Sequence, residues 1–127
     1  RALLAAMAEE GPPWPVSQLA QQAGISALQN APDWPFRVRQ QLEEERRYLS
    51  QELSRLRFHV YPSDSNFLLF QGEEGWRERL LDRGILIRSC ADFQGLGPGF
   101  YRVCVRSRGQ NKRLIQAIQQ EREAFHG

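Results

Sequence analysis

Two arginines lie within segments whose other residues are typical of buried strands. The stretches ILIRSC (residues 85–90) and FYRVCVRS (residues 100–107) are rich in β-branched and aromatic residues, yet they carry Arg88 and Arg102. The planar guanidinium of arginine can make two hydrogen bonds to one carboxylate or phosphate. Because an unpaired buried guanidinium is unfavourable, a half-buried arginine requires an anionic partner. Two such arginines on neighbouring strands fit a ligand with two anionic groups.

Strand alternation separates these arginines from the predicted core. Successive strand side chains point to opposite faces, so Tyr101 and Val103 share one face while Arg102 and Cys104 share the other. Arg88 likewise alternates with the two isoleucines of its segment. A simpler interpretation stays open, in which both are ordinary surface arginines or are paired with nearby carboxylates.

The elements that carry these residues follow from periodicity and from glycine and proline breaks. Helices come first and short mixed strands and helices follow, which predicts an α+β two-layer sandwich with a small, mainly antiparallel sheet and helices on one face. We expect helices at 1–10, 18–28, 34–56, 74–84 and 108–125, and strands at 57–61, 66–70, 85–90 and 100–107. Ser17 is expected to cap the second helix and Gly84 to end the fourth. Much of the core is expected from Phe67, Leu69, Ile85, Ile87, Val103 and Val105.

The composition is that of one ordinary soluble globular domain. The chain has 127 residues, of which 41% are hydrophobic and 25% charged, and no apolar run is long enough to span a membrane. The net charge of +2 is too small to imply nucleic-acid binding. RNA-binding sheets also expose aromatic residues beside their basic groups, whereas Tyr101 is expected on the face opposite Arg102. Cys90 and Cys104 have no metal or disulfide spacing, which indicates reduced thiols in a cytoplasmic protein.

Three stretches carry a resemblance to a known family: PPWPVSQLAQQAG, SDSNFLLF and ILIRSCADFQGLGPGFYRVCVRSRGQNKRLIQAI. Together they resemble the C-terminal small domain of the fold-type I, pyridoxal phosphate (PLP)-dependent aminotransferase superfamily. The resemblance is to its threonine-phosphate decarboxylase branch, close to the histidinol-phosphate aminotransferases. Arg106 stands where an aminotransferase of this group more usually has glycine, which favours the decarboxylase branch.

The resemblance implies roles for both strand arginines. Arg102 matches the arginine that holds the substrate α-carboxylate, and Arg88 matches the one that helps bind the substrate phosphate. The Schiff-base lysine and the phosphate cradle belong to a large domain that has no counterpart here, and Lys112 is expected to be a surface residue. The resemblance therefore implies the substrate-binding domain of a PLP-dependent L-threonine O-3-phosphate decarboxylase of cobalamin biosynthesis. We expect this chain alone to be inert and to bind no cofactor.

The same resemblance sets the expected domains and partners. Residues 1–32 are expected to be the end of a connecting helix and a linker from the missing large domain, and residues 33–127 the substrate-binding domain. The first residue is Arg1 rather than methionine, which suggests a piece of a longer chain. Expected partners are that large domain, a small phosphorylated amino-acid substrate and a second copy of the parent, with no nucleic acid or membrane.

Other interpretations stay open. The parent would alternatively be a histidinol-phosphate aminotransferase or another class I or II aminotransferase. An alternative of a different class is a free-standing α+β module that binds an anion or a protein. The loop 91–99 would either border the substrate entrance or simply connect the two arginine strands. Arg106 and Arg108 are expected to be surface or structural residues.

Overall fold

A computed structural model describes residues 2–11 and 16–126, and the chain divides into two units between residues 37 and 38. The first unit contains helices α1 (Ala2–Glu10) and α2 (Gln18–Asn30). Ser17 caps α2, as the sequence predicts, because its hydroxyl accepts a hydrogen bond of 3.3 Å from the Ala20 amide. The prolines of the predicted helix breaker, at 12–15, lie outside the described residues. The domain boundary expected after residue 32 stays a prediction.

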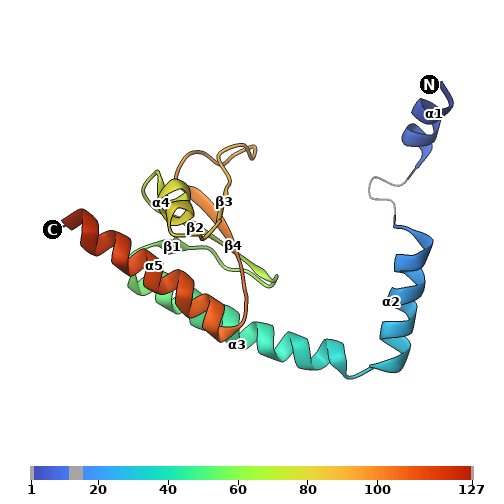
Figure 1. The fold of residues 1–127 in the computed structure, drawn as a ribbon, viewed down its shortest axis with the longest axis horizontal. Coiled ribbons are helices and arrows are strands. Elements are labelled where there is room, and N and C mark those ends of the chain that lie inside the picture. Colours follow the sequence, from blue (N-terminus) through green and yellow to red (C-terminus); the bar gives the residue numbers. More distant parts are fainter. Residues whose placement is uncertain (1, 12–15, 127) are drawn as a thin grey trace. The chain divides into compact units, whose positions relative to one another are not determined.

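The second unit holds the sheet and the remaining helices (Figure 1). Helix α3 (Trp34–Arg55) spans the division between the units. It is followed by β1 (His59–Val60), β2 (Phe67–Gln71), α4 (Trp76–Asp82), β3 (Arg88–Ser89), β4 (Phe100–Cys104) and α5 (Arg108–His126). The four strands form one antiparallel sheet in the order β1-β2-β4-β3. This arrangement confirms the predicted α+β class with a small antiparallel sheet.

One face of the sheet is covered by helices and forms the core. The strand residues Leu68, Phe70, Tyr101 and Val103 are at most 5% exposed. They belong to one apolar cluster with residues of α3, α4 and α5, which include Leu49, Leu53, Trp76, Leu80, Ile115 and Ile118. Each fully buried side chain of this kind stabilises the fold by about 1.5–3 kcal/mol. The helices at 34–56 and 108–125 therefore cover the sheet as the sequence predicts.

The alternation expected for β2 is wrong by one residue. Leu68 and Phe70 are buried, while Phe67 and Leu69 are only half-buried. The pairing with β4 explains the difference, because Leu69 lies opposite Arg102 and therefore shares its face. Since all four residues of FLLF are apolar, the sequence alone does not reveal which face is inward.

The strand expected at 85–90 shortens to the two residues of β3. The preceding residues close α4 instead: the Ile85 amide donates to the Leu80 carbonyl at 2.8 Å, and Gly84 adopts a left-handed conformation with φ of 71°. Ile85 packs against the core and Ile87 is 3% exposed. The inward direction predicted for both isoleucines is thus confirmed, although Ile85 is only partly buried.

Candidate functional site

Arg88 and Arg102 lie directly opposite one another on the outer strand β3 and its inner neighbour β4. Directly paired residues of an antiparallel sheet project from the same face, and Arg102 alternates with the buried Tyr101 and Val103. Both arginines therefore project from the face that carries Phe67 and away from the core. The sequence-based expectation that the two strands bring them together is met by this register.

Arg102 is held by an aromatic neighbour. It is half-buried, and its guanidinium carbon lies 4.5 Å from the centroid of the Phe67 ring. A cation over a ring at this distance is attracted by the ring's negative face. The ring that was expected in the core thus forms a platform under Arg102, which limits the directions that the guanidinium can take.

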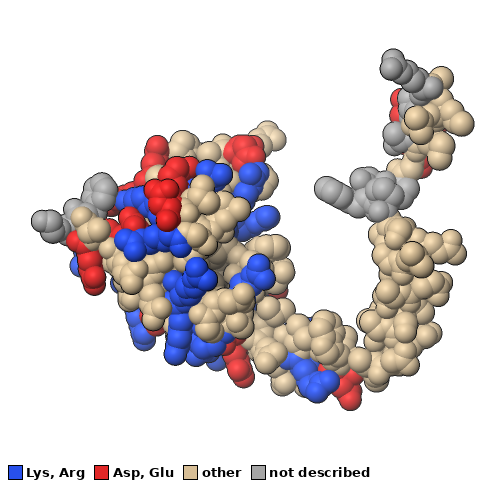
Figure 2. Space-filling view, in the orientation of Figure 1, with Lys and Arg blue, Asp and Glu red and all other residues tan. Residues whose placement is uncertain are grey.

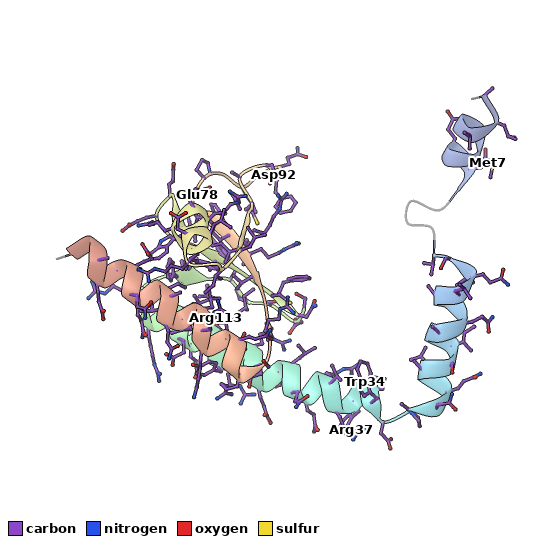
Figure 3. All side chains as sticks on the ribbon, in the orientation of Figure 1. Met7, Trp34, Arg37, Glu78, Asp92 and Arg113 are labelled. Carbon is purple, nitrogen blue, oxygen red and sulfur yellow. The ribbon has the colours of Figure 1, made fainter. Side chains whose placement is uncertain are left out.

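Arg88 already has a carboxylate partner. Its Nη2 lies 2.5 Å from Oδ2 of Asp92, and its guanidinium carbon lies 5.5 Å from the ring of Phe93. Figure 3 shows Asp92 on the loop that follows β3. Because 51% of the Arg88 side chain and 62% of the Asp92 side chain are exposed, this ion pair is weak. Asp92 was not among the residues predicted from the sequence, although it follows Arg88 by only four residues.

A pocket of about 550 Å³ contains both arginines. It lies between the segment 84–88, the end of β4 and the first turns of α5. No aspartate or glutamate is among the residues that line it, and the lining includes five arginines: Arg77, Arg88, Arg102, Arg106 and Arg113. Figure 2 shows basic side chains gathered along α5 and the adjoining strands. We call the pocket lined by these five arginines the arginine pocket. Its positive charge favours an anionic ligand.

The five arginines differ in their partners. Arg77 pairs with its neighbour Glu78 at 3.0 Å, and Arg88 pairs with Asp92 as described above. Within residues 2–11 and 16–126, no carboxylate forms an ion pair with Arg102, Arg106 or Arg113. Three of the five positive charges are therefore available for a ligand.

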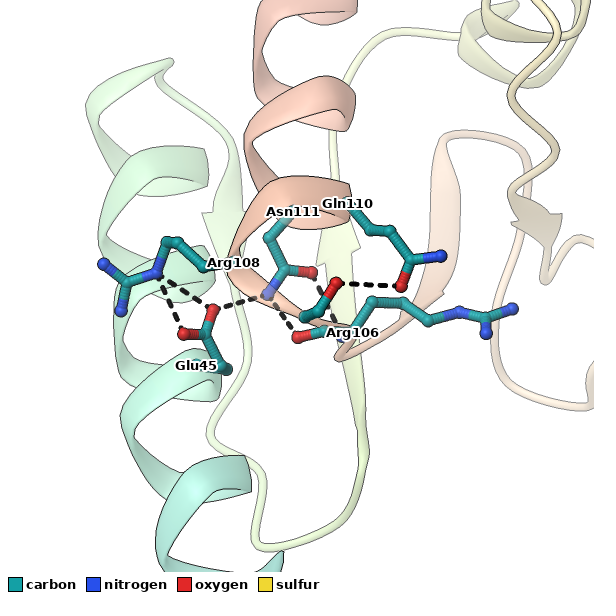
Figure 4. Close-up of polar contacts among 6 residues, drawn as sticks. Glu45, Arg106, Arg108, Gln110 and Asn111 are labelled. Carbon is teal, nitrogen blue, oxygen red and sulfur yellow. Dashed lines mark hydrogen bonds and ion pairs between the residues drawn. The ribbon is translucent and has the colours of Figure 1, made fainter.

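A buried polar network fixes the turn between β4 and α5 (Figure 4). Asn111 is 2% exposed; its Oδ1 accepts from the Arg106 amide at 3.0 Å, and its Nδ2 donates to the Arg106 carbonyl at 2.8 Å and to Glu45 at 2.9 Å. Arg108 donates to both oxygens of Glu45 at 2.9 and 3.0 Å and stacks 4.1 Å from the Tyr48 ring. Arg108 is thus the structural residue that the sequence allowed.

The network also sets the charge state of its carboxylate. Burial opposes ionisation of Glu45, but the hydrogen bonds from Arg108 and Asn111 outweigh it and hold the pKa of Glu45 below its usual value. This partnership could not be predicted from local sequence patterns, because Glu45 and Asn111 lie 66 residues apart. An asparagine in the first turn of a predicted helix was the one available signal.

The two cysteines differ in exposure. Cys90 is 1% exposed, and burial raises the pKa of its thiol although Arg102 and Arg88 oppose the shift. Cys104 is half-buried on the arginine face, and both thiols are free. Cys90 directly follows β3 and is buried close enough to both strand arginines for their charges to act on its thiol. A buried, protonated thiol is a packing group rather than a nucleophile.

Neither a metal site nor a membrane-spanning helix is found in the described part of the chain. No group of three or more His, Cys, Asp or Glu side chains there is arranged to hold a metal ion. Among the described helices, none combines the length and the apolar character needed to cross a membrane. The single lysine, Lys112, is exposed on α5 and does not line the arginine pocket.

Comparison with known proteins reveals relatives over most of the chain. Residues 1–118 match the family model described as aminotransferase class I and II. A threonine-phosphate decarboxylase from Salmonella typhimurium is 40% identical over 92% of this chain and 33% of its own length. A histidinol-phosphate aminotransferase from Methanoculleus marisnigri is 38% identical over 65% of this chain and 24% of its own length.

Solved structures agree on the fold. The L-threonine-O-3-phosphate decarboxylase from Porphyromonas gingivalis superimposes with a TM-score of 0.72 at 24% identity, covering 85% of this chain and 35% of that protein. The chain thus spans a third or less of the curated relatives described above. Because the family model matches nearly the whole sequence, the chain belongs to the class I and II aminotransferase family.

Proposed function

We propose that this chain is the substrate-binding domain of a PLP-dependent L-threonine O-3-phosphate decarboxylase. Arg102 would hold the substrate α-carboxylate and Arg88 the substrate phosphate. The observation that carries the proposal is the direct pairing of these two arginines in one pocket. The 40% identity to a threonine-phosphate decarboxylase supports this choice of substrate. We place the activity in the cytoplasm, within cobalamin biosynthesis.

The two contacts differ in strength because their surroundings differ. Arg102 is half-buried, lies over Phe67 and has no carboxylate partner among the described residues, so it is ready to bind a carboxylate through its fork. Arg88 must exchange Asp92 for a phosphate oxygen. A dianionic phosphate competes well against one exposed carboxylate, because it offers more charge and more acceptor oxygens. Together the two arginines would orient a substrate that carries a carboxylate at one end and a phosphate at the other.

The described residues do not fit the cofactor itself. PLP chemistry in this family needs a lysine amine, and the chain's only lysine lies outside the arginine pocket. We therefore assign cofactor binding to a large domain of the same polypeptide, and we assign no chemical step to the residues described here. The parent would act as a homodimer on a small phosphorylated amino acid, and the 127-residue chain alone would be inactive.

A second candidate is a histidinol-phosphate aminotransferase. The 38% identity to such an enzyme over 65% of this chain favours it. The substrates differ in one chemical respect: L-histidinol phosphate has a phosphate but no carboxylate, whereas O-phospho-L-threonine has both. Arg102 would thus contact the phosphorylated substrate's own carboxylate only in the decarboxylase.

An assay of the full-length protein loaded with PLP would distinguish the two. We expect carbon dioxide release from O-phospho-L-threonine and little amino transfer from L-histidinol phosphate to 2-oxoglutarate. Rapid transfer from L-histidinol phosphate without carbon dioxide release would reject the decarboxylase in favour of the aminotransferase. Absence of both reactions, with PLP bound, would reject both candidates.

A further inference from the structure

The arginine pocket holds more positive charge than the Arg88–Arg102 pair supplies. Arg106 and Arg113 also line it, and neither has an ion-pair partner within the described ranges. Both are exposed rather than covered by apolar residues. The lining contributes no carboxylate that would neutralise them.

The backbone of Arg106 is fixed while its side chain is free. Asn111 bonds both the amide and the carbonyl of Arg106, at 3.0 and 2.8 Å. None of the bonds of this network uses the Arg106 guanidinium. Figure 4 shows the side chain extending away from the Glu45 network. Arg106 is therefore a cation on a rigid support.

Gln110 provides a second donor beside Arg106. The Ser107 hydroxyl donates to Oε1 of Gln110 at 3.1 Å, which occupies the carbonyl end of the amide. The amide nitrogen then faces outward in the same direction as the Arg106 guanidinium, as Figure 4 shows. Gln110 lines the same pocket and offers two N–H donors there.

Arg113 reaches the opposite wall of the pocket. Its Nη2 lies 3.9 Å from the position that a Cβ atom on Gly84 would occupy. Gly84 closes α4 and lines the pocket, so Arg113 extends from α5 across to the segment before β3. Figure 3 shows Arg113 on α5.

These donors lie apart from the pair on β3 and β4. Arg106 follows Arg102 by four residues, which corresponds to about 13 Å of extended backbone. Arg88 lies opposite Arg102, not opposite Arg106. The pair on β3 and β4 and the donors of 106–113 therefore occupy different stretches of the backbone that lines the pocket.

We propose that Arg106, Gln110 and Arg113 form a second oxyanion subsite, which binds inorganic phosphate or the phosphoryl group of a phosphomonoester. Two guanidinium groups match the charge of a phosphate dianion, and the amide adds donors for its remaining oxygens. The subsite goes beyond the proposed function, because it requires neither decarboxylation nor the contacts of Arg88 and Arg102.

The test is an NMR titration of the isotopically labelled 127-residue chain with sodium phosphate, against sodium chloride at equal ionic strength. Backbone amides of 106–113 and the arginine Nε–H signals report binding. We expect a saturable shift with phosphate and none with chloride. Arg106→Gln and Arg113→Gln should each weaken binding about tenfold or more, because each removes a charge-assisted contact. The phosphate affinity of Arg106→Lys should lie between those of the unchanged chain and Arg106→Gln, because lysine keeps the charge but loses the planar guanidinium.

Two controls separate the subsite from general charge and from the proposed function. Arg39→Gln removes the same charge from an exposed position on α3 and should change the affinity by less than about twofold. Arg88→Gln removes a charge from the same pocket, and it should weaken the phosphate affinity of 106–113 by less than Arg106→Gln does. The Arg106→Gln variant keeps its backbone bonds to Asn111, so we expect an unchanged circular dichroism spectrum; Arg113→Gln provides an independent test.

Three results would overturn the subsite. The first is an equal response to phosphate and chloride, and the second is an equal loss in Arg39→Gln and Arg106→Gln. The third is loss of phosphate binding in Arg88→Gln or Arg102→Gln but not in Arg106→Gln or Arg113→Gln. In that third case the proposed function would stand, because the only phosphate contact would be the one assigned to Arg88.

Discussion

Arg88 and Arg102 face each other across β3 and β4, but only Arg88 is paired with a carboxylate. Asp92 lies 2.5 Å from Arg88, whereas Arg102 rests over the Phe67 ring with no carboxylate partner in the described part of the chain. The two side chains therefore differ in what a ligand must displace. A ligand at Arg102 has no carboxylate of the described residues to displace, whereas a ligand at Arg88 must displace Asp92.

This difference predicts unequal substrate effects in the full-length enzyme. Arg102→Gln should lower kcat/KM about tenfold to a hundredfold for every substrate with an α-carboxylate, because each loses one charge-assisted contact. Arg88→Gln should lower kcat/KM by a similar factor for O-phospho-L-threonine but little for L-threonine, which lacks the second anion. Steady-state kinetics on both substrates measure the two effects. Equal losses on the two substrates in Arg88→Gln would show that Arg88 is no phosphate ligand.

Removing the competing carboxylate should strengthen phosphate recognition at Arg88. Asp92→Asn releases an exposed ion pair worth at most about 1 kcal/mol, so KM for O-phospho-L-threonine should fall by about two- to fivefold. KM for L-threonine should not change. Asp82→Asn, at an exposed position on α4, removes the same charge and serves as the matched control. A higher KM in Asp92→Asn would mean that Asp92 positions Arg88 for the substrate instead of competing for it.

The hydrogen bonds of Asn111 should stabilise the folded state. Asn111→Ala leaves the amide and carbonyl of Arg106 without their partner and should lower the free energy of unfolding by about 2–4 kcal/mol. Gln116→Ala, exposed on the same helix, should change it by less than about 0.5 kcal/mol. Urea denaturation measures both.

Glu45→Gln isolates the charge in this network. Because the folded state lowers the pKa of Glu45, its ionised form stabilises the fold above the ordinary glutamate pKa of about 4.3, and this stabilisation is lost as pH falls through the folded-state pKa. The destabilisation of Glu45→Gln should therefore be largest near pH 7 and shrink below about pH 4. A pH-independent difference would show that the hydrogen-bond geometry, and not the charge, matters at this position.

The register of β2 predicts opposite outcomes for adjacent leucines. Leu68→Ala opens a cavity in the core and should lower the free energy of unfolding by about 2–5 kcal/mol. Leu69→Ala, on the arginine face, should lower it by less than about 1.5 kcal/mol because Leu69 is only half-buried. Thermal unfolding of the two variants measures the difference. The reverse order would place the strand in the alternation that we expected from the sequence.

The sequence predicts the elements well because their signals are local. Helix periodicity, Ser17 as a cap and Gly84 as a helix end depend on residues within one or two turns. The direction of the Arg102 side chain also follows from the local sequence, because successive side chains of β4 point to opposite faces of the sheet.

The remaining features depend on pairing between distant segments. The apolar run FLLF has no alternation, so only its register against β4 decides that Leu69 shares the face of Arg102. Glu45 meets Arg108 and Asn111 only after α3 and α5 pack together. Asp92 is close to Arg88 in sequence, but the fold of the loop 91–99 brings its carboxylate onto the guanidinium.

Both outer strands of the sheet, β1 and β3, are only two residues long. An outer strand presents unpaired backbone N–H and C=O groups, and long flat ones recruit strands from other molecules into aggregates. Two residues present too few of these groups to template such growth, and at β3 one of the two carries a guanidinium. The short outer strands therefore predict that concentrated solutions of this chain resist edge-to-edge polymerisation.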